Sequence, residues 1–236
     1  RLRCDWSSDV CSSDLRLGDV EFRVAPLDRG KLKQALIKAG FPVEDLAGYR
    51  QGESLEIVLR KRSLAGEPFQ LRKYQQDAAD IFHAAGAARG GSGVIVLPCG
   101  SGKTIVGLAC MAKLQTSTLI LTTNVTATRQ WIGEVLDKTT LAKDQVGEYS
   151  GSHKNVLPVT VATYNIMTWR KSKDAPFKHL ELFDQRDWGL IIYDEVHLLP
   201  APVFQVTAAL QARRRLGLTA TLVREDNRED DVFALI

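Results

Sequence analysis

An apolar run that leads into a glycine-bearing turn constrains this chain more than any other feature of its sequence. Val94–Leu97 is apolar and mostly β-branched, Pro98–Gly102 contains two glycines, and after Gly-Lys-Thr a helical pattern runs from Ile105 to Lys113. This order predicts a buried strand, a phosphate-binding loop and the helix that the loop opens, because backbone N–H groups and the positive end of a helix dipole hold an anion. We expect Lys103 to reach the outer phosphates and the Thr104 hydroxyl to ligate Mg²⁺.

The loop departs from the strict pattern G-x-x-x-x-G-K-[ST] at one position, because Leu97 stands where the first glycine belongs. The short motif alone is therefore only an indication, and residues at other strand ends must decide. From Val94 onward, apolar strands alternate with helical stretches. We predict strands at 94–97, 119–122, 159–162, 190–193 and 216–219, and helices at 71–85, 104–113, 126–136 and 203–212.

This alternation predicts an α/β fold in which helices cover both faces of a parallel sheet. Ligands of such sheets bind beyond the carboxyl ends of the strands. In the helix at 71–85, one face would carry Tyr74, Ala78, Ile81 and Phe82. The glycine-rich stretch at 86–93 precedes a strand and opens no helix, so we interpret it as a flexible connector. The polar residues 170–187 predict a surface insertion with one short helix.

The amino-acid composition further limits the class of protein, its partners and its location. The chain of 236 residues is 44% hydrophobic and 25% charged, which is typical of a soluble protein with one domain and a small appendage. The net charge of +3 permits nucleic acid as a partner without arguing for it. Since no apolar run approaches the roughly 18 residues of a membrane span and no signal-peptide pattern is present, we expect a cytoplasmic protein.

The N-terminal part divides into segments of different character. Residues 1–15, with Cys4 and Cys11, repeat Ser-Ser-Asp and resemble a translated sequencing adapter; the alternative is a disordered polar tail. Neither predicts a zinc site, and Cys99 and Cys110 are expected to be reduced thiols. Residues 16–62 predict a small α+β unit with strands at 20–24 and 55–59 around a helix at 29–39, and residues 63–70 have linker composition. Residues 71–236 would form the main domain.

A second strong signal is an apolar strand, Gly189–Tyr193, that ends in the acids Asp194 and Glu195. Parallel strands deliver such residues to the edge where the phosphate loop lies. Asp194 would hold Mg²⁺, and Glu195 would orient and deprotonate the attacking water in phosphoryl transfer. The alternative is an acidic pair that caps the following helix, which the nearby Gly-Lys-Thr disfavours.

Several motifs together resemble the superfamily-2 helicases. Pro98–Thr104, Asp194–His197 and Leu218–Thr221 are similar to motifs I, II and III, and Leu71–Gln75 is similar to the preceding adenine-recognising Q motif. Arg224–Asp226 resembles the RED motif of the XPB family of DNA repair helicases. The flanking segments Leu121–Asn124 and Leu198–Phe204 also resemble that family, and the likeness covers residues 19–236.

The resemblance implies a RecA-like first motor lobe of a DNA-dependent ATPase and 3′–5′ DNA helicase that uses ATP and Mg²⁺. It assigns catalysis to Glu195, Asp194 and Lys103, and Mg²⁺ ligation to Thr104 and Asp194. It assigns coupling of the nucleotide state to His197, Thr219 and Thr221. Nucleotide binding would fall to the following residues: Arg72 and Gln75 at adenine, with Pro98, Cys99, Gly100, Ser101, Gly102, Lys103 and Thr104 at the phosphates.

The resemblance implies DNA as the partner, at junctions of duplex and single strand, and it allows a repair nuclease as a further partner. Thr123, Asn124 and Arg129 follow a strand and open a helix, where phosphates bind well. By resemblance alone, Thr163 and Tyr164 would contact DNA, as would Arg224, Glu225 and Asp226, whose mixed charge is otherwise that of a helix start. We expect the second motor lobe, with its arginine finger, to be missing from this sequence. The alternatives are another superfamily-2 translocase, or a nucleotide-dependent DNA-binding module without turnover.

Overall fold

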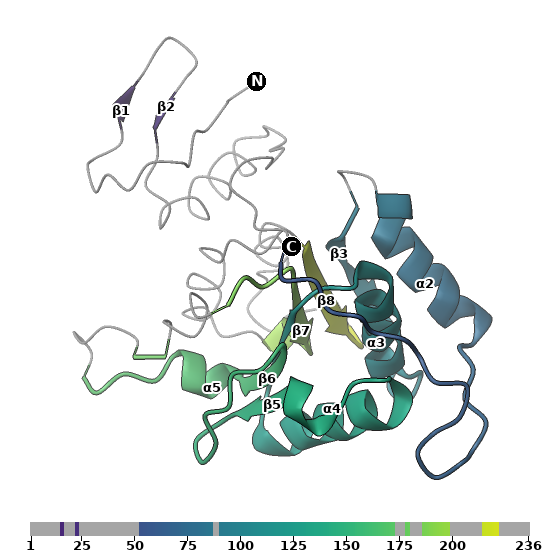
Figure 1. The fold of residues 1–236 in the computed structure, drawn as a ribbon. Coiled ribbons are helices and arrows are strands. Elements are labelled where there is room, and N and C mark those ends of the chain that lie inside the picture. Colours follow the sequence, from purple (N-terminus) through teal and green to yellow (C-terminus); the bar gives the residue numbers. More distant parts are fainter. Residues whose placement is uncertain are drawn as a thin grey trace.

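Six parallel strands form the sheet on which this protein is built (Figure 1). They lie in the order β3-β8-β7-β4-β6-β5. We analysed a computed structural model, which describes residues 15–16, 22–23, 52–86, 90–172, 178–179, 186–198 and 214–221. The strands are β3 (Ser92–Val96), β4 (Thr118–Thr122), β5 (Val146–Tyr149), β6 (Val159–Thr163), β7 (Leu190–Asp194) and β8 (Arg214–Thr219). The predicted α/β fold with a parallel sheet is confirmed.

Three helices accompany the sheet: α2 (Lys73–His83), α3 (Lys103–Leu114) and α4 (Val125–Lys138). They pack in sequence, α2 against α3 and α3 against α4. The shorter α5 (Tyr164–Met167) follows β6, and Figure 1 shows it at the opposite end of the sheet from α2. Short 3₁₀ turns occur at Ala84–Gly86, Lys143–Gln145 and Val196–Leu198. No helix among these described segments is long and apolar enough to cross a membrane.

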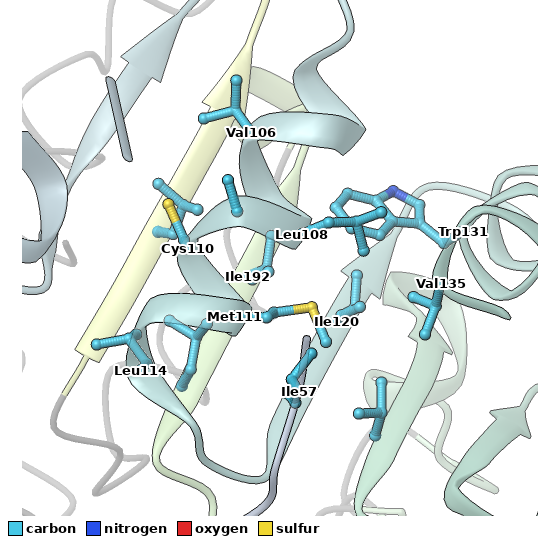
Figure 2. Close-up of a cluster of buried hydrophobic side chains, with 14 of the residues drawn as sticks. Ile57, Val106, Leu108, Cys110, Met111, Leu114, Ile120, Trp131, Val135 and Ile192 are labelled. Carbon is cyan, nitrogen blue, oxygen red and sulfur yellow. The ribbon is translucent and has the colours of Figure 1, made fainter. Parts of the chain in front are cut away.

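Side chains of β4, β6 and β7 alternate between two buried clusters, as a pleated strand requires. Ile120 of β4 joins the cluster beneath α3 and α4, whereas its neighbours Leu119 and Leu121 join the cluster on the other face. Figure 2 shows the first cluster, in which Met111 of α3 points toward Ile120 and Ile57. These clusters bury both faces of the sheet, which explains why its strands are continuous apolar runs.

Residues 52–62 contribute directly to this core. Leu55 and Ile57 are 8% and 1% exposed and belong to the first cluster. The strand predicted at 55–59 is wrong in detail, since only isolated bridges form, between Ser54 and Thr116 and between Leu59 and Thr139. A regular ladder does not form because the Gln115 side chain bonds both backbone groups of Ile57. The domain boundary predicted after residue 62 stays a prediction. Residues 52–62, however, pack against the core of the main domain.

The described part of the N-terminal region also contains one antiparallel pair. β1 (Leu15–Arg16) pairs with β2 (Phe22–Arg23), which lies inside the strand predicted at 20–24. The helices predicted at 29–39 and 203–212 lie outside the described residues, as do most of 170–187 and both Cys4 and Cys11.

Three details of the predicted elements are wrong. β5 was not predicted, because Val146–Tyr149 contains a glycine and a glutamate and lacks a clear alternation. The buried face of α2 is formed by Gln75, Ala79 and Phe82, while Ile81 is 79% exposed. The stretch interpreted as a connector ends earlier than expected, because Ser92 and Gly93 already belong to β3.

Candidate active site

The phosphate loop links β3 to α3 through two residues with left-handed backbone geometry. Gly100 has φ of 75° and Gly102 has φ of 82°, a region that favours glycine. α3 then begins at Lys103, so the first backbone N–H groups of the helix point toward the loop. Leu97 packs against the first core cluster, and its N–H donates to the Thr219 carbonyl at 3.0 Å. The leucine at this position therefore extends the strand and leaves the turn to Gly100 and Gly102.

Lys103 and Glu195 meet at the carboxyl edge of the sheet. The Lys103 Nζ atom lies 3.2 Å from Oε1 of Glu195, and the lysine side chain is 11% exposed. Glu195 has φ of 49°, which is strained for a residue with a side chain. Its Oε2 atom is buried and has no hydrogen-bond partner among the described residues. A strained residue with an unsatisfied buried oxygen fits a site that completes its bonds when it binds a ligand.

Asp194 is held from two sides. The indole N–H of Trp131, on α4, donates to its Oδ2 atom at 2.9 Å, and Trp131 itself is 1% exposed. The Tyr164 hydroxyl donates to the Asp194 backbone carbonyl at 2.7 Å. Burial raises the pKa of the Asp194 carboxyl, and the Trp131 bond opposes this shift. Burial also raises the pKa of Tyr164 well above its ordinary value, so its phenol stays protonated and can donate.

A coupling chain runs from Glu195 to the end of β8, in which His197 contacts the acid and is hydrogen-bonded to Thr219. His197 Nδ1 lies 3.5 Å from Glu195 Oε2 and 2.8 Å from the Thr219 hydroxyl oxygen. That hydroxyl donates its one proton to the Thr221 carbonyl at 2.6 Å and accepts from the Thr221 N–H. It must therefore accept from His197, which assigns the imidazole proton to Nδ1. The three residues predicted to couple the nucleotide state are thus brought together.

Of the two predicted adenine-binding residues, Gln75 contacts the loop, whereas Arg72 donates to the Tyr74 hydroxyl. The Gln75 amide donates to the Ser101 carbonyl at 3.1 Å and accepts from the Arg72 backbone N–H at 2.9 Å. Gln75 is buried, and a Cβ atom on Gly102 would lie 2.6 Å from its Nε2. The structure therefore shows Gln75 as a brace of the phosphate loop, whereas adenine recognition by Arg72 and Gln75 stays a prediction.

The remaining phosphate-loop residues are arranged as a tight turn. The Ser101 hydroxyl donates to the Pro98 carbonyl at 2.6 Å, and the Ser101 backbone N–H donates to the same oxygen at 3.2 Å. Cys99 and Gly100 are exposed, while Thr104 is half-buried at the start of α3. The Thr104 hydroxyl and the Asp194 carboxylate are oxygen donors of the kind Mg²⁺ takes, and the loop amides suit the phosphates that would complete its shell.

The residues predicted to contact DNA divide into three groups. Asn124 is exposed and caps α4 by accepting from the Ala127 N–H at 2.9 Å, and it also donates to Thr123. Arg129 is 63% exposed and lies 3.7 Å from Glu148. Thr163 and Tyr164 are both buried, and Tyr164 belongs to the second core cluster and donates to the Asp194 carbonyl. Their contact with DNA stays a prediction. The third group, 224–226, lies outside the described residues.

Comparison with known proteins shows which family this chain belongs to. A family model described as "Type III restriction enzyme, res subunit" matches residues 68–224, well over half of the chain. The chain belongs to this family. It is 59% identical to the DNA 3′-5′ helicase XPB of Kineococcus radiotolerans, over 90% of this chain and 36% of that protein. With the protein of the same name from Mycobacterium tuberculosis the identity is 57%, over 94% of this chain and 38% of the relative.

The chain thus spans little more than a third of the length of these relatives. The predicted resemblance to XPB helicases is confirmed. Among solved structures, the UvsW helicase of bacteriophage T4 superposes with a TM-score of 0.59 at 17% identity, covering 89% of this chain and 76% of that one. At this identity the superposition supports the RecA-like fold alone.

Sequence reasoning missed two residues that contact the site. Trp131 fills the space above Gly107, where a Cβ atom would lie 2.6 Å from the indole ring, and so the aromatic reaches Asp194 from α4. Tyr74 donates to the Ser101 carbonyl beside Gln75. An apolar helix position such as 131 carries no signal of its own for this contact, because it depends on how α3 and α4 pack. Tyr74 could have been found from its position next to Gln75.

Proposed function

We propose that this chain is the ATP-binding motor lobe of a DNA-dependent ATPase that acts as a 3′–5′ DNA helicase in DNA repair. The observation that carries the proposal is the pair Lys103–Glu195, 3.2 Å apart at the mouth of the phosphate loop and linked through His197 to Thr219. The names of the relatives support the same activity and disfavour another kind of translocase. Cytoplasmic location and a nuclease partner remain part of the proposal.

Each residue of the site would have its own role in ATP hydrolysis. The amides of the loop and of the first turn of α3 bind the phosphates, and Lys103 neutralises charge that develops on the transferred group. Thr104 and Asp194 would hold Mg²⁺, which supplies charge neutralisation when bound. Glu195 takes the proton of the attacking water. The ion pair with Lys103 positions this carboxylate beside the phosphate loop, where the base is needed.

The coupling chain would connect this chemistry to DNA. A change in the contacts of Glu195 is felt by His197, and through the Thr219 hydroxyl by the backbone of Thr221. DNA would lie along the same sheet edge, with Thr123, Asn124 and Arg129 as the described contacts and 224–226 as further ones. Energetic coupling between two sites is carried by contiguous hydrogen-bond networks of this kind.

Substitution of the paired residues tests the proposal. We expect Lys103→Ala to weaken binding of a fluorescent ATP analogue at least 10-fold, because a buried charge partner of the phosphates is lost. Glu195→Gln should retain binding, since it removes only the base. Hydrolysis is best followed in a chimera of this chain with the remainder of the Kineococcus relative, where we expect Glu195→Gln to lower DNA-stimulated turnover by about 10²–10⁴-fold.

The two variants control for each other. Loss of analogue binding in both would indicate a folding defect, to be checked by circular dichroism. Wild-type turnover by the Glu195→Gln chimera would refute the assigned base. ATP-analogue binding without any DNA-stimulated hydrolysis by the unmodified chimera would instead favour the alternative, a nucleotide-dependent DNA-binding module.

A further inference from the structure

A cluster of aromatic and cationic side chains lies beyond the ends of β5 and β6. It consists of Tyr149, Lys154, Trp169, Lys178 and His179, and we call it the Trp169 cluster. The rings contact one another in order: Trp169 and His179 have centroids 5.8 Å apart, and His179 and Tyr149 have centroids 5.7 Å apart. The Tyr149 hydroxyl also lies 2.9 Å from His179 Nδ1.

Two ammonium groups accompany these rings. Lys178 Nζ lies 5.9 Å from the centroid of the Trp169 ring, and Lys154 Nζ lies 4.9 Å from that of Tyr149. The charges that act on this cluster repel one another. The pKa of His179 is lowered by burial and by both lysines, and that of Lys154 is lowered by burial and by Lys178. Each positive charge in the cluster disfavours the charged form of its neighbours. An anion bound among these groups would relieve that repulsion, so the cluster is suited to binding an anion.

Trp169 is the exposed ring of the cluster. Its side chain is 49% exposed, whereas Tyr149 is 8% exposed and anchors the cluster in the second core. A half-exposed indole with cations beside it combines the two features that bind single-stranded nucleic acid. The flat ring stacks on a base, and the ammonium groups bind the adjoining phosphates.

The position of the cluster favours nucleic acid over another anion. All six strands are parallel, so Trp169 and Tyr149 emerge at the same edge as the phosphate loop and Asn124. The strand order places β6 and β5 directly after β4, at the end of the sheet opposite the phosphate loop after β3. A strand that passes Asn124 would continue onto the Trp169 cluster.

We infer that the Trp169 cluster binds an unpaired nucleotide, by stacking its base on Trp169 and placing its phosphate between Lys154 and Lys178. A paired base inside a duplex cannot stack on a side chain, so the cluster would select the single-stranded part of a DNA substrate. This inference deepens the proposed function, on which it rests, by naming the form of DNA that the lobe engages.

Fluorescence anisotropy of labelled oligonucleotides tests the inference in this chain. The probes are a single strand of about 15 thymidines, the same strand with abasic sites, and a blunt duplex. We expect Trp169→Ala to weaken binding of the thymidine strand about 10-fold and Trp169→Phe to restore most of it. Lys154→Ala with Lys178→Ala should reduce the salt dependence of binding. The abasic strand should bind weakly and be insensitive to Trp169→Ala.

Matched controls separate the cluster from general surface effects. Lys143→Ala removes an exposed lysine just before β5, at the opposite edge of the sheet, and Ile81→Ala removes an exposed apolar side chain on α2. Neither should change binding more than about 2-fold. If Trp169→Ala fails to fold, quenching of indole fluorescence by the thymidine strand, compared between wild type and Trp169→Phe, measures the same contact.

The outcomes are distinct. Equal binding of the thymidine and abasic strands, or full binding by Trp169→Ala, would overturn the inference and leave the proposed function intact. Equal loss of duplex and single-strand binding in Trp169→Ala would also overturn it, because paired bases cannot stack. If the wild-type chain binds the ATP analogue but no oligonucleotide, the inference fails together with the DNA-dependent part of the proposed function.

Discussion

Asp194 is the residue whose surroundings say most about the site. Its carboxylate is buried, which is unfavourable for its charged form, and it is stabilised by the Trp131 indole and by the ammonium of Lys103. Donors that hold a metal-binding carboxylate orient it before the ion arrives. Trp131 is thus a positioning residue, although its place on an apolar face is that of an ordinary core aromatic.

Removal of the indole donor tests this role. We expect Trp131→Phe to leave metal-free binding of the ATP analogue unchanged and to weaken the enhancement by Mg²⁺ about 10-fold, because the Asp194 carboxylate loses its orienting bond. Titration of Mg²⁺ at fixed analogue concentration measures the effect. Trp188→Phe, a substitution of another buried tryptophan in the second cluster, should behave as wild type. Equal Mg²⁺ dependence in both variants would contradict the assignment.

The two described cysteines provide a second test at this scale. Cys99 is exposed in the phosphate loop, whereas burial raises the pKa of Cys110 to about 12. In a Cys4→Ser, Cys11→Ser background, we expect a disulfide reagent to modify Cys99 within minutes and Cys110 only on unfolding, since the thiolate is the reactive form. Bound ATP analogue should protect Cys99. Modification of Cys99 at an unchanged rate would place the nucleotide elsewhere.

Among the elements, the segment 52–62 has the least expected role. It is not a regular strand, yet Ile57 lies under α3 against Met111 and is bonded through its backbone to Gln115 (Figure 2). Its neighbour Val58 is 48% exposed. The segment therefore closes the bottom of the first cluster, and the lobe needs it for stability.

This arrangement predicts a contrast between adjacent residues. Ile57→Ala should lower the free energy of unfolding by about 2–5 kcal/mol, because it leaves a cavity beneath α3. Val58→Ala should change it by less than about 0.5 kcal/mol. Urea denaturation followed by circular dichroism measures both. Similar values for the two variants would show that the segment is not part of the cooperative core.

At the scale of the whole molecule, the site occupies one edge of a single sheet. Lys103, Asp194 and Glu195 face that edge, and this chain covers only 36% and 38% of the two relatives that share this lobe. The family resemblance implies that a second lobe supplies an arginine finger across this edge, where the unsatisfied Glu195 oxygen lies. Binding and turnover should therefore separate when these 236 residues are assayed by themselves.

We expect the 236-residue chain to bind the ATP analogue but to hydrolyse ATP about 10³–10⁵-fold more slowly than the chimera with the rest of the Kineococcus relative, because an arginine finger contributes that factor. Steady-state phosphate release with and without DNA measures the difference. Robust DNA-stimulated hydrolysis by the chain itself would show that its own residues complete the site.

The local sequence was sufficient for the elements whose signal is local. Strands buried on both faces are continuous apolar runs, and a helix that opens after Gly-Ser-Gly-Lys-Thr carries its own start signal, so five of the strands, α3 and the positions of Lys103, Asp194 and Glu195 were predicted. β5 was not predicted because its sequence includes a glycine and a glutamate. It is a strand because it pairs with β6.

Only the tertiary structure determined which side chains meet. Trp131 reaches Asp194 because Gly107 lets α4 pack closely against α3, and Gln75 braces Ser101 because α2 lies beside the loop. Tyr164, which the family resemblance assigns to a DNA contact, donates from its buried position to the Asp194 carbonyl. The phosphate loop is therefore a property of the local sequence. The buried contacts that orient its acids depend on packing between elements distant in the chain, which no local pattern encodes.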